Sequence, residues 1–208
     1  LKKIPSWERG KIVGNVFQDP RSQFFANEVA GEIAFGCENY GYSHEEIRNH
    51  VHRAAADIKI QDILDHSLHS LSYGMRQKVA IASAEAIDPE IYVMDEPSAN
   101  LDIASTYRFA DIIHDLKKKG KTIIIAEHRL YYLVPYADRI FYMKHGSIVR
   151  QFTGAKFQKL PPDELQGMGL RALDPFHLSP EAIPKQEAPT LHIKGFQFSY
   201  EKHGPLNV

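Results

Sequence analysis

Two short segments constrain the fold of this chain more than any other feature. Residues 71–77 read Leu-Ser-Tyr-Gly-Met-Arg-Gln, in which Ser72 can cap a helix and Gly74 lets a ligand approach the backbone. The free N–H groups and the dipole at such a helix start favour a phosphate. Further along, an apolar run ends in Asp95 and Glu96, and a buried strand that presents two carboxylates can hold Mg²⁺ and polarise a water molecule. Together the two segments indicate half of a nucleotide-hydrolysing site.

Both segments resemble motifs of the ABC-type ATPases, and further segments extend the resemblance over most of residues 1–150. They occur in the family's order, which argues against chance, because a single Gln or His after an apolar strand is common. The segments are residues 16–20 (Q-loop), 71–77 (signature motif), 92–97 (Walker B strand), 98–102 (D-loop) and 126–128 (switch histidine).

The resemblance implies roles for four residues at a hydrolysis centre. Asp95 is expected to hold Mg²⁺, and Glu96 is expected to act as the general base for the attacking water. Gln18 supplies a neutral amide whose oxygen can ligate Mg²⁺ and orient water. His128 is expected at the γ-phosphate. The plainer alternatives are polar strand ends for Gln18 and the acid pair, and a surface or structural histidine.

The resemblance also implies a second set of ATP contacts. Ser72, Gly74 and Asp102 are expected to bind ATP across an interface with a second ABC domain, and Asn100 is expected to line the same interface. Tyr200 is expected to stack on adenine in that second domain.

The signature segment departs from the family's common Leu-Ser-Gly-Gly-Gln form. Tyr73 stands in place of a glycine and Met75 in place of the glutamine. Met cannot hydrogen-bond a ribose as an amide can. Whether both ATP sites of such a protein are active is therefore left open by the sequence.

The sequence contains no P-loop, which requires Gly-x-x-x-x-Gly-Lys-Ser/Thr between a strand and a helix. Gly120-Lys121-Thr122 is the nearest match, but Asp115 occupies the position of the first glycine, and the triplet reads as a helix end followed by a strand. We therefore expect an internal fragment of a tandem ATPase that is inactive by itself. Residues 1–150 are expected to form a first ABC nucleotide-binding domain without its Walker A portion. Residues 151–190 are expected to be a Pro-rich interdomain linker, and residues 191–208 the first strand of a second ABC domain.

The hydrophobic periodicity predicts an α/β fold, a partial P-loop NTPase-like domain with a parallel-sheet core and an α-helical signature subdomain at about residues 26–86. Ser43 and Glu46 form a capping box for a helix that ends at Ile58, and Ser72 starts a helix that ends at Ala86. The expected strands are residues 11–17, 91–94, 122–126, 139–143 and 147–152. The other expected helices are residues 103–119 and 130–137, with one helical turn within residues 162–170.

The composition limits the classes of function. Hydrophobic residues make up 43% of the chain and the formal net charge is −1, so the chain can bury a core but has no bulk basicity for nucleic acid. The single cysteine, Cys37, excludes a disulfide framework and is expected to pack as a small hydrophobe. No apolar run approaches the roughly 20 residues that span a bilayer, so a membrane role would depend on a partner.

Within the superfamily, residues 17–23 and 127–130, together with the expected pair of ATPase domains, resemble the ATPase component of energy-coupling factor importers. That family implies ATP and Mg²⁺ as cofactors, a cytoplasmic position on the inner face of the cell membrane, and import of a vitamin or a metal ion. The implied partners are a transmembrane coupling protein and a substrate-binding membrane component. A soluble ABC ATPase of translation or DNA repair and a non-hydrolysing docking module are the alternatives. The sequence does not identify the transported substrate.

Overall fold

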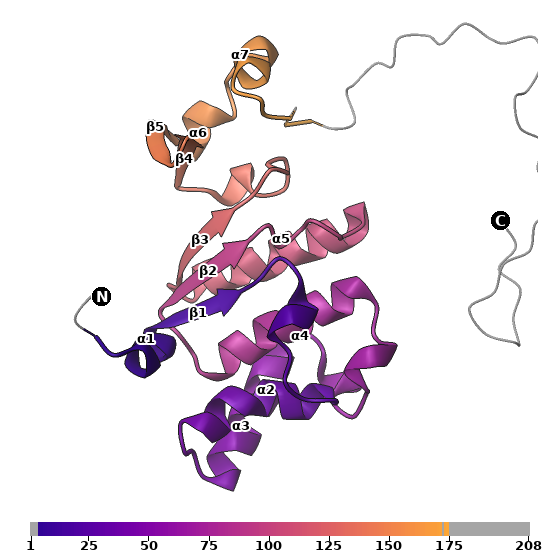
Figure 1. Ribbon diagram of the computed structural model, residues 1–208. Helices are drawn as coiled ribbons and strands as arrows, with labels where there is room; N and C mark the ends of the chain where they lie inside the picture. The colour runs from indigo at the N-terminus through magenta and orange to yellow at the C-terminus, as the bar shows by residue number, and fades with distance from the viewer. Residues whose placement is uncertain (1–3, 172, 175–208) are drawn as a thin grey trace, which may run out of the picture. The chain divides into compact units, whose positions relative to one another are not determined.

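A parallel sheet forms the core, and its strands come from widely separated parts of the chain. The computed structural model describes residues 4–171, 173 and 174. The predicted α/β architecture with a parallel-sheet core is confirmed. The strand order is β1 (Val13–Val16), β2 (Ile91–Asp95) and β3 (Thr122–Ala126) (Figure 1).

The register of the sheet brings the ends of its strands together. Val16 pairs with Met94, and Asp95 pairs with Ala126. Because all three strands are parallel, the loops that follow them start at the same edge of the sheet. In open sheets of this class, ligands bind at the carboxyl ends of the strands.

The two faces of the sheet differ in their cover. Tyr92 and Met94 point toward the helices and are buried. On the opposite face, Val93 is 37% exposed and its register partner Ile124 is 55% exposed. Parallel sheets are normally covered on both faces. Within the described residues, one face of this sheet therefore presents apolar side chains to solvent.

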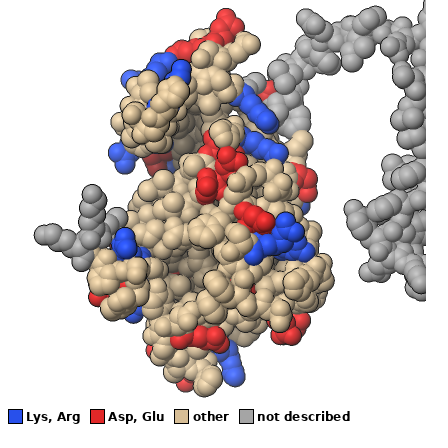
Figure 2. All heavy atoms as spheres, viewed as in Figure 1, with Lys and Arg blue, Asp and Glu red and all other residues tan. Residues whose placement is uncertain are grey.

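The surface carries charges of both signs. Figure 2 shows Lys and Arg interspersed with Asp and Glu, and no continuous basic stripe crosses the face that it displays. In the part of the chain that the structure describes, no helix has the length and apolar character needed to cross a membrane.

The helical insertion that the periodicity predicted lies between β1 and β2. The predicted capping box is present, because the Ser43 hydroxyl accepts from the Glu46 N–H while the Glu46 carboxylate accepts from the Ser43 N–H at 2.7 Å. This explains why α3 begins where it does. The elements of the insertion are η1 (Pro20–Gln23), α2 (Val29–Asn39), α3 (His44–Ile58), η2 (Gln61–Ile63), η3 (Leu68–Ser70) and α4 (Tyr73–Ala86).

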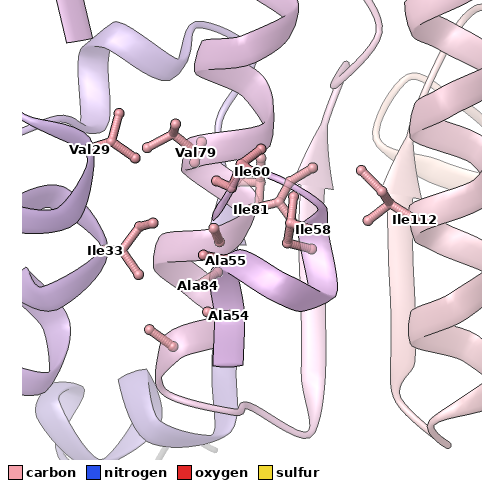
Figure 3. Close-up of a cluster of buried hydrophobic side chains, with 14 of the residues drawn as sticks. Val29, Ile33, Ala54, Ala55, Ile58, Ile60, Val79, Ile81, Ala84 and Ile112 are labelled. Carbon is pink, nitrogen blue, oxygen red and sulfur yellow. The ribbon is translucent and has the colours of Figure 1, made fainter. Parts of the chain in front are cut away.

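The main core lies between this insertion, the sheet and α5 (Ile103–Lys118), which connects β2 to β3. Figure 3 shows buried side chains of α2, α3 and α4 lying together, among them Ile33, Ala55 and Ile81. Full burial of one isoleucine side chain stabilises the fold by about 1.5–3 kcal/mol. Cys37 is also fully buried, as expected for a small hydrophobe.

A partly buried polar network joins the insertion to the sheet. Lys119, which follows α5, forms ion pairs with Asp57 of α3 at 2.6 Å and with Glu85 of α4 at 3.2 Å. The Glu85 carboxylate also accepts a hydrogen bond from the Tyr92 hydroxyl of β2. Burial raises the pKa of Glu85, and the charge of Lys119 opposes that rise.

The predicted strand over residues 11–17 is too long. It covers only Val13–Val16, and a short helix that we did not predict, α1 (Ser6–Ile12), precedes it. Pro5 precedes the first turn, a position that suits proline because helix-start N–H groups have no partner within the helix. The Tyr40 hydroxyl donates to the Trp7 carbonyl oxygen at 3.1 Å and so attaches α1 to α2.

The predicted helix over residues 130–137 is wrong. The chain there forms turns and a short 3-10 helix, η4 (Val134–Tyr136). Pro135 lies inside the predicted helix, has no N–H to donate, and disfavours helical geometry at the residue before it. The apolar spacing of this segment therefore did not produce a helix.

A hairpin and two short helices follow η4. They are β4 (Arg139–Lys144), β5 (Ser147–Thr153), α6 (Gly154–Phe157) and α7 (Pro162–Gly167), and α7 confirms the predicted helical turn. Phe152, Phe157 and Leu165 form a small second core here. The predicted boundary at residue 150 falls inside β5, so the first part of the expected linker is folded. That residues 151–190 connect two domains stays a prediction, and residues 191–208 lie outside the described part.

Candidate active site

Three of the predicted site residues meet at the carboxyl edge of the sheet. Gln18 follows β1, Glu96 follows β2 and His128 follows β3. The Gln18 amide donates to Glu96 Oε2 at 3.1 Å, and His128 Nε2 lies 2.9 Å from Glu96 Oε1. Because an ionised carboxylate only accepts, Nε2 is the imidazole donor in this contact. The structure thus brings the amide, the acid and the imidazole into one cluster.

The backbone at Glu96 is in the left-handed region, with φ of +40°. Its N–H donates to the Ala126 carbonyl at 2.8 Å, and its carbonyl accepts from the Ala99 N–H at 3.0 Å. A residue other than glycine rarely adopts a positive φ unless surrounding contacts hold it there. Residues with such backbone geometry cluster at functional sites.

Asp95 is the last residue of β2 and its side chain is exposed. Among the described residues, no group of three or more His, Cys, Asp or Glu could hold a metal ion. Mg²⁺ sites with phosphate substrates need only one or two protein oxygens, with phosphate and water as the other ligands. Asp95 and the amide oxygen of Gln18 suit such a site, since Gln18 uses its nitrogen to bind Glu96.

The predicted start of the signature helix is confirmed. The Ser72 hydroxyl accepts from the Met75 N–H at 3.3 Å, and the Ser72 side chain is exposed at the beginning of α4. A hollow of about 130 Å³ lies beside it, lined by residues that include Ser72, Gly74, Lys78 and Arg108. Burial lowers the pKa of Lys78, and the nearby Arg108 lowers it further.

Gly74 allows close packing between helices. A Cβ at this position would lie 3.2 Å from the Ser105 hydroxyl oxygen of α5. A larger residue would therefore crowd the contact of α4 with α5, and the Ser105 side chain would have to shift by a few tenths of an ångström. Its expected approach to a ligand stays a prediction.

Tyr73, the residue that departs from the family's signature, has a defined partner. Its hydroxyl donates to the backbone carbonyl oxygen of Gln18. The first turn of α4 is thereby joined to the residue whose side chain binds Glu96. The sequence marked Tyr73 as unusual but contained no signal for this long-range contact.

Asp102 caps α5. Its carboxylate accepts from the Ser105 N–H at 2.7 Å and from the Ser105 hydroxyl at 3.0 Å, and these hydrogen bonds lower the pKa of Asp102. Asn100, two residues earlier, is exposed. The structure does not bring Asp102 into contact with Gln18, Glu96 or His128, and Tyr200 lies outside the described residues.

The loop after β3 holds two further polar residues, Glu127 and Arg129, for which the sequence reasoning assigned no role. Both bind to the segment that follows Glu96. The sequence feature that could have pointed to them is their position on either side of His128, immediately after a strand of β-branched residues.

Comparison with known proteins shows which family this sequence resembles. The family model described as "ABC transporter" matches residues 1–99. The energy-coupling factor transporter ATP-binding protein EcfA of Methanocaldococcus jannaschii is 38% identical over 69% of this chain and 51% of its own length. The cobalt import ATP-binding protein CbiO of Rhodobacter capsulatus is 36% identical over 74% of this chain and 54% of its own length.

A solved structure agrees with these relatives. The structure of cbiO1 from Clostridium perfringens, described as part of the ABC transporter complex cbiONQ, superimposes with a TM-score of 0.67 at 33% identity, and covers 71% of this chain and 59% of that one. The chain thus spans 51–59% of the length of these three proteins, and 38% of the length of a putative ABC transporter ATP-binding protein of Treponema denticola. With the ordered motifs and the cluster around Glu96, these matches show that the chain contains a domain of the ABC transporter family and that its relatives are ABC ATP-binding proteins.

Proposed function

We propose that this domain hydrolyses ATP to power a membrane importer for a vitamin or a metal ion. The observation that carries the proposal is the Glu96 carboxylate, held between the Gln18 amide at 3.1 Å and the His128 imidazole at 2.9 Å. A docking module that does not hydrolyse ATP would not require a carboxylate, an amide and an imidazole in contact with one another. The resemblance to EcfA and CbiO supports an importer rather than a soluble ABC ATPase.

In the proposed reaction, Glu96 accepts a proton from a water molecule as the water oxygen bonds to the γ-phosphorus and the bond from that phosphorus to the bridging oxygen breaks. His128 donates a hydrogen bond to the γ-phosphate, and Gln18 orients the water. When bound, Mg²⁺ neutralises phosphate charge, and Asp95 and the Gln18 oxygen are the residues that would hold it. Binding of nucleotide is expected to draw Gln18 and His128 from Glu96 and free its oxygens for the water.

The wider assembly is part of the proposal. Ser72, Gly74 and Asp102 would act on ATP held by a second ABC domain, in which Tyr200 would stack on adenine. A transmembrane coupling protein and a substrate-binding membrane component would be the partners, at the cytoplasmic face of the cell membrane. The 208-residue chain by itself is expected to be inactive, because it contains no P-loop.

Replacement of Glu96 tests the proposed chemistry. In the full-length gene product, with any second site silenced, Glu96→Gln should lower ATP turnover by about 10²–10⁴-fold, because the amide cannot accept the proton. The amide keeps the shape of the side chain, so nucleotide binding should persist. Phosphate release and ATP binding are the two measurements.

Glu46→Gln is the matched control, because Glu46 accepts hydrogen bonds in the capping box of α3, away from the cluster. It should turn over ATP at the wild-type rate. Near-normal turnover by the Glu96→Gln protein would show that another group activates the water. A full-length wild-type protein that binds but never hydrolyses ATP would favour the docking module.

A further inference from the structure

The two loops that carry Glu96 and His128 are bound to each other. One loop follows β2 and continues from Glu96 through residues 98–101, and the other follows β3 and contains His128. Because β2 and β3 are parallel neighbours, the loops start side by side. Besides the contact of His128 with Glu96, polar contacts between the loops come from Glu127 and Arg129, which flank His128.

The Glu127 carboxylate uses one oxygen within its own loop and the other to join the two loops. Its Oε1 accepts from the N–H groups of His128 at 2.8 Å and Arg129 at 3.0 Å. Its Oε2 accepts from the Ser98 hydroxyl at 2.6 Å, the Ser98 N–H at 3.3 Å and the Tyr132 hydroxyl at 2.8 Å. A carboxylate has about four lone-pair sites. Glu127 is therefore fully occupied by the protein and is not free to bind a metal or a substrate.

The two partners of Glu127 Oε2, Ser98 and Tyr132, are sheltered from water. Ser98 is 0% exposed and Tyr132 is 1% exposed. Burial raises the pKa of the Tyr132 hydroxyl, and the negative charge of Glu127 raises it further. Tyr132 therefore stays a neutral donor to Glu127. Hydrogen bonds to a charged acceptor are stronger than those between neutral groups.

The side chain of Arg129 binds backbone carbonyl groups of the same loop, residues 98–101. One guanidinium nitrogen donates to the carbonyls of Ser98 at 3.2 Å and Leu101 at 3.0 Å, and the other donates to the carbonyl of Ala99 at 3.2 Å. The planar fork of arginine suits several acceptors at once, which the single ammonium of lysine cannot match. These three hydrogen bonds restrict movement of the 98–101 loop relative to the loop that contains His128.

The fixed loop constrains Glu96. The carbonyl of Glu96 accepts from Ala99, and its N–H donates to Ala126, so its strained backbone lies between the two loops that Glu127 and Arg129 join. We propose that Glu127 and Arg129 are positioning residues, which lock the 98–101 loop to the His128 loop and thereby hold Glu96 and His128 where both can act on the same bound nucleotide. This proposal rests on the proposed function, because the separation of Glu96 and His128 matters for turnover only if they act on ATP.

The test compares kcat, KM for ATP and melting temperature in the full-length gene product. Arg129→Ala and Glu127→Gln should lower kcat by about 10–100-fold with KM within about twofold of wild type, because small misplacement of reacting groups costs rate rather than binding. Arg129→Lys should recover most of the melting temperature but little of kcat, since it keeps the charge without the fork.

Arg150→Ala is the matched control. Arg150 forms an ion pair with Glu164 at 2.7 Å and lies over the ring of Phe152, at the edge of the small second core. Its loss should lower the melting temperature while kcat stays within about twofold of wild type. If Arg129→Ala and Glu127→Gln lose activity only in proportion to their folded fraction, or not at all, the positioning role is wrong.

Hydrogen exchange separates failure of this proposal from failure of the proposed function. In the same full-length protein, Arg129→Ala should speed exchange of the backbone amides of residues 96–102, and Arg150→Ala should not. Unchanged exchange would overturn the proposal even if kcat falls. If the wild-type protein has no ATPase activity, the proposed function is wrong, and so is the expected effect of the two residues on turnover. If the wild type is active and the Arg129→Ala and Glu127→Gln proteins are equally active, only the positioning role is wrong.

Discussion

Tyr73 shows how a single substitution in a motif can acquire a new contact. The family's glycine has no side chain, whereas the Tyr73 hydroxyl here reaches the carbonyl oxygen of Gln18. The signature helix and the residue that binds Glu96 are thereby connected through one hydroxyl group. Removal of that group should loosen Gln18 without disturbing the packing of the ring.

We therefore expect Tyr73→Phe to lower ATP turnover of the full-length gene product by about 2–13-fold, the equivalent of the roughly 0.5–1.5 kcal/mol that one hydrogen bond contributes. Steady-state ATPase measurements check this value. Tyr107→Phe is the control, because Tyr107 is 45% exposed, packs its ring on Tyr131 and forms no hydroxyl hydrogen bond within the described residues. Equal activities of the two variants would mean that the Tyr73 contact has no effect on Gln18.

The positions of the site residues could be predicted, but most of their partners could not. Gln18, Glu96 and His128 each follow a strand, and parallel strands place such residues at one edge of the sheet. Partners such as Ser98 for Glu127 depend on how two loops fold against each other. Neither hydrophobic periodicity nor motif spacing contains that information. The assigned roles in catalysis and nucleotide binding stay predictions.

At the scale of elements, local capping chemistry was the most reliable guide. Ser43 and Ser72 begin α3 and α4 where the sequence predicted, because a side-chain oxygen must satisfy N–H groups of the first turn. Residues 130–137 have helical apolar spacing, yet Pro135 outweighs it. Helix α1 was missed because it has no buried residue and hence no apolar pattern.

The network around Lys119 gives an element-scale prediction about pH. A carboxyl whose pKa is raised by burial favours folding when protonated, so its contribution falls as pH rises from the unfolded value of about 4.3 through the folded pKa. Lys119→Met removes the cation that offsets this loss. We expect the melting temperature to fall by several degrees at neutral pH and by less at pH values below the unfolded carboxyl pKa.

Thermal unfolding of wild type and Lys119→Met across this pH range provides the measurement. Lys118→Met is a suitable control, because the Lys118 side chain is 65% exposed and its only ion pair among the described residues is at 4.0 Å. A difference between Lys119→Met and wild type that is the same at every pH would show that Glu85 is not the group whose ionisation matters.

At the scale of the whole molecule, the proposed function requires surfaces that belong to two domains at once. Ser72 is exposed at the start of α4, where a phosphate held by another domain could approach. Ser72→Arg would fill that position with a large charged side chain. In the full-length gene product we expect it to abolish most ATP turnover, with a loss of stability no greater than the roughly 1 kcal/mol of a helix cap.

Ser43→Arg removes the corresponding cap of α3 and should cost similar stability without affecting turnover. Melting temperature and ATPase activity, measured side by side, distinguish the two variants. Wild-type turnover by the Ser72→Arg protein would show that this helix start does not bind nucleotide.

The left-handed backbone of Glu96 has a consequence for protein engineering. Asn and Gly tolerate that conformation better than Glu, and a backbone held in a sparsely populated region costs about 1–3 kcal/mol. Laboratory selection for heat resistance alone should therefore enrich Asn or Gly at position 96 and deliver thermostable proteins that have lost their proposed base. Libraries built on this scaffold need a second screen for activity, because here the most stable residue and the most useful one differ.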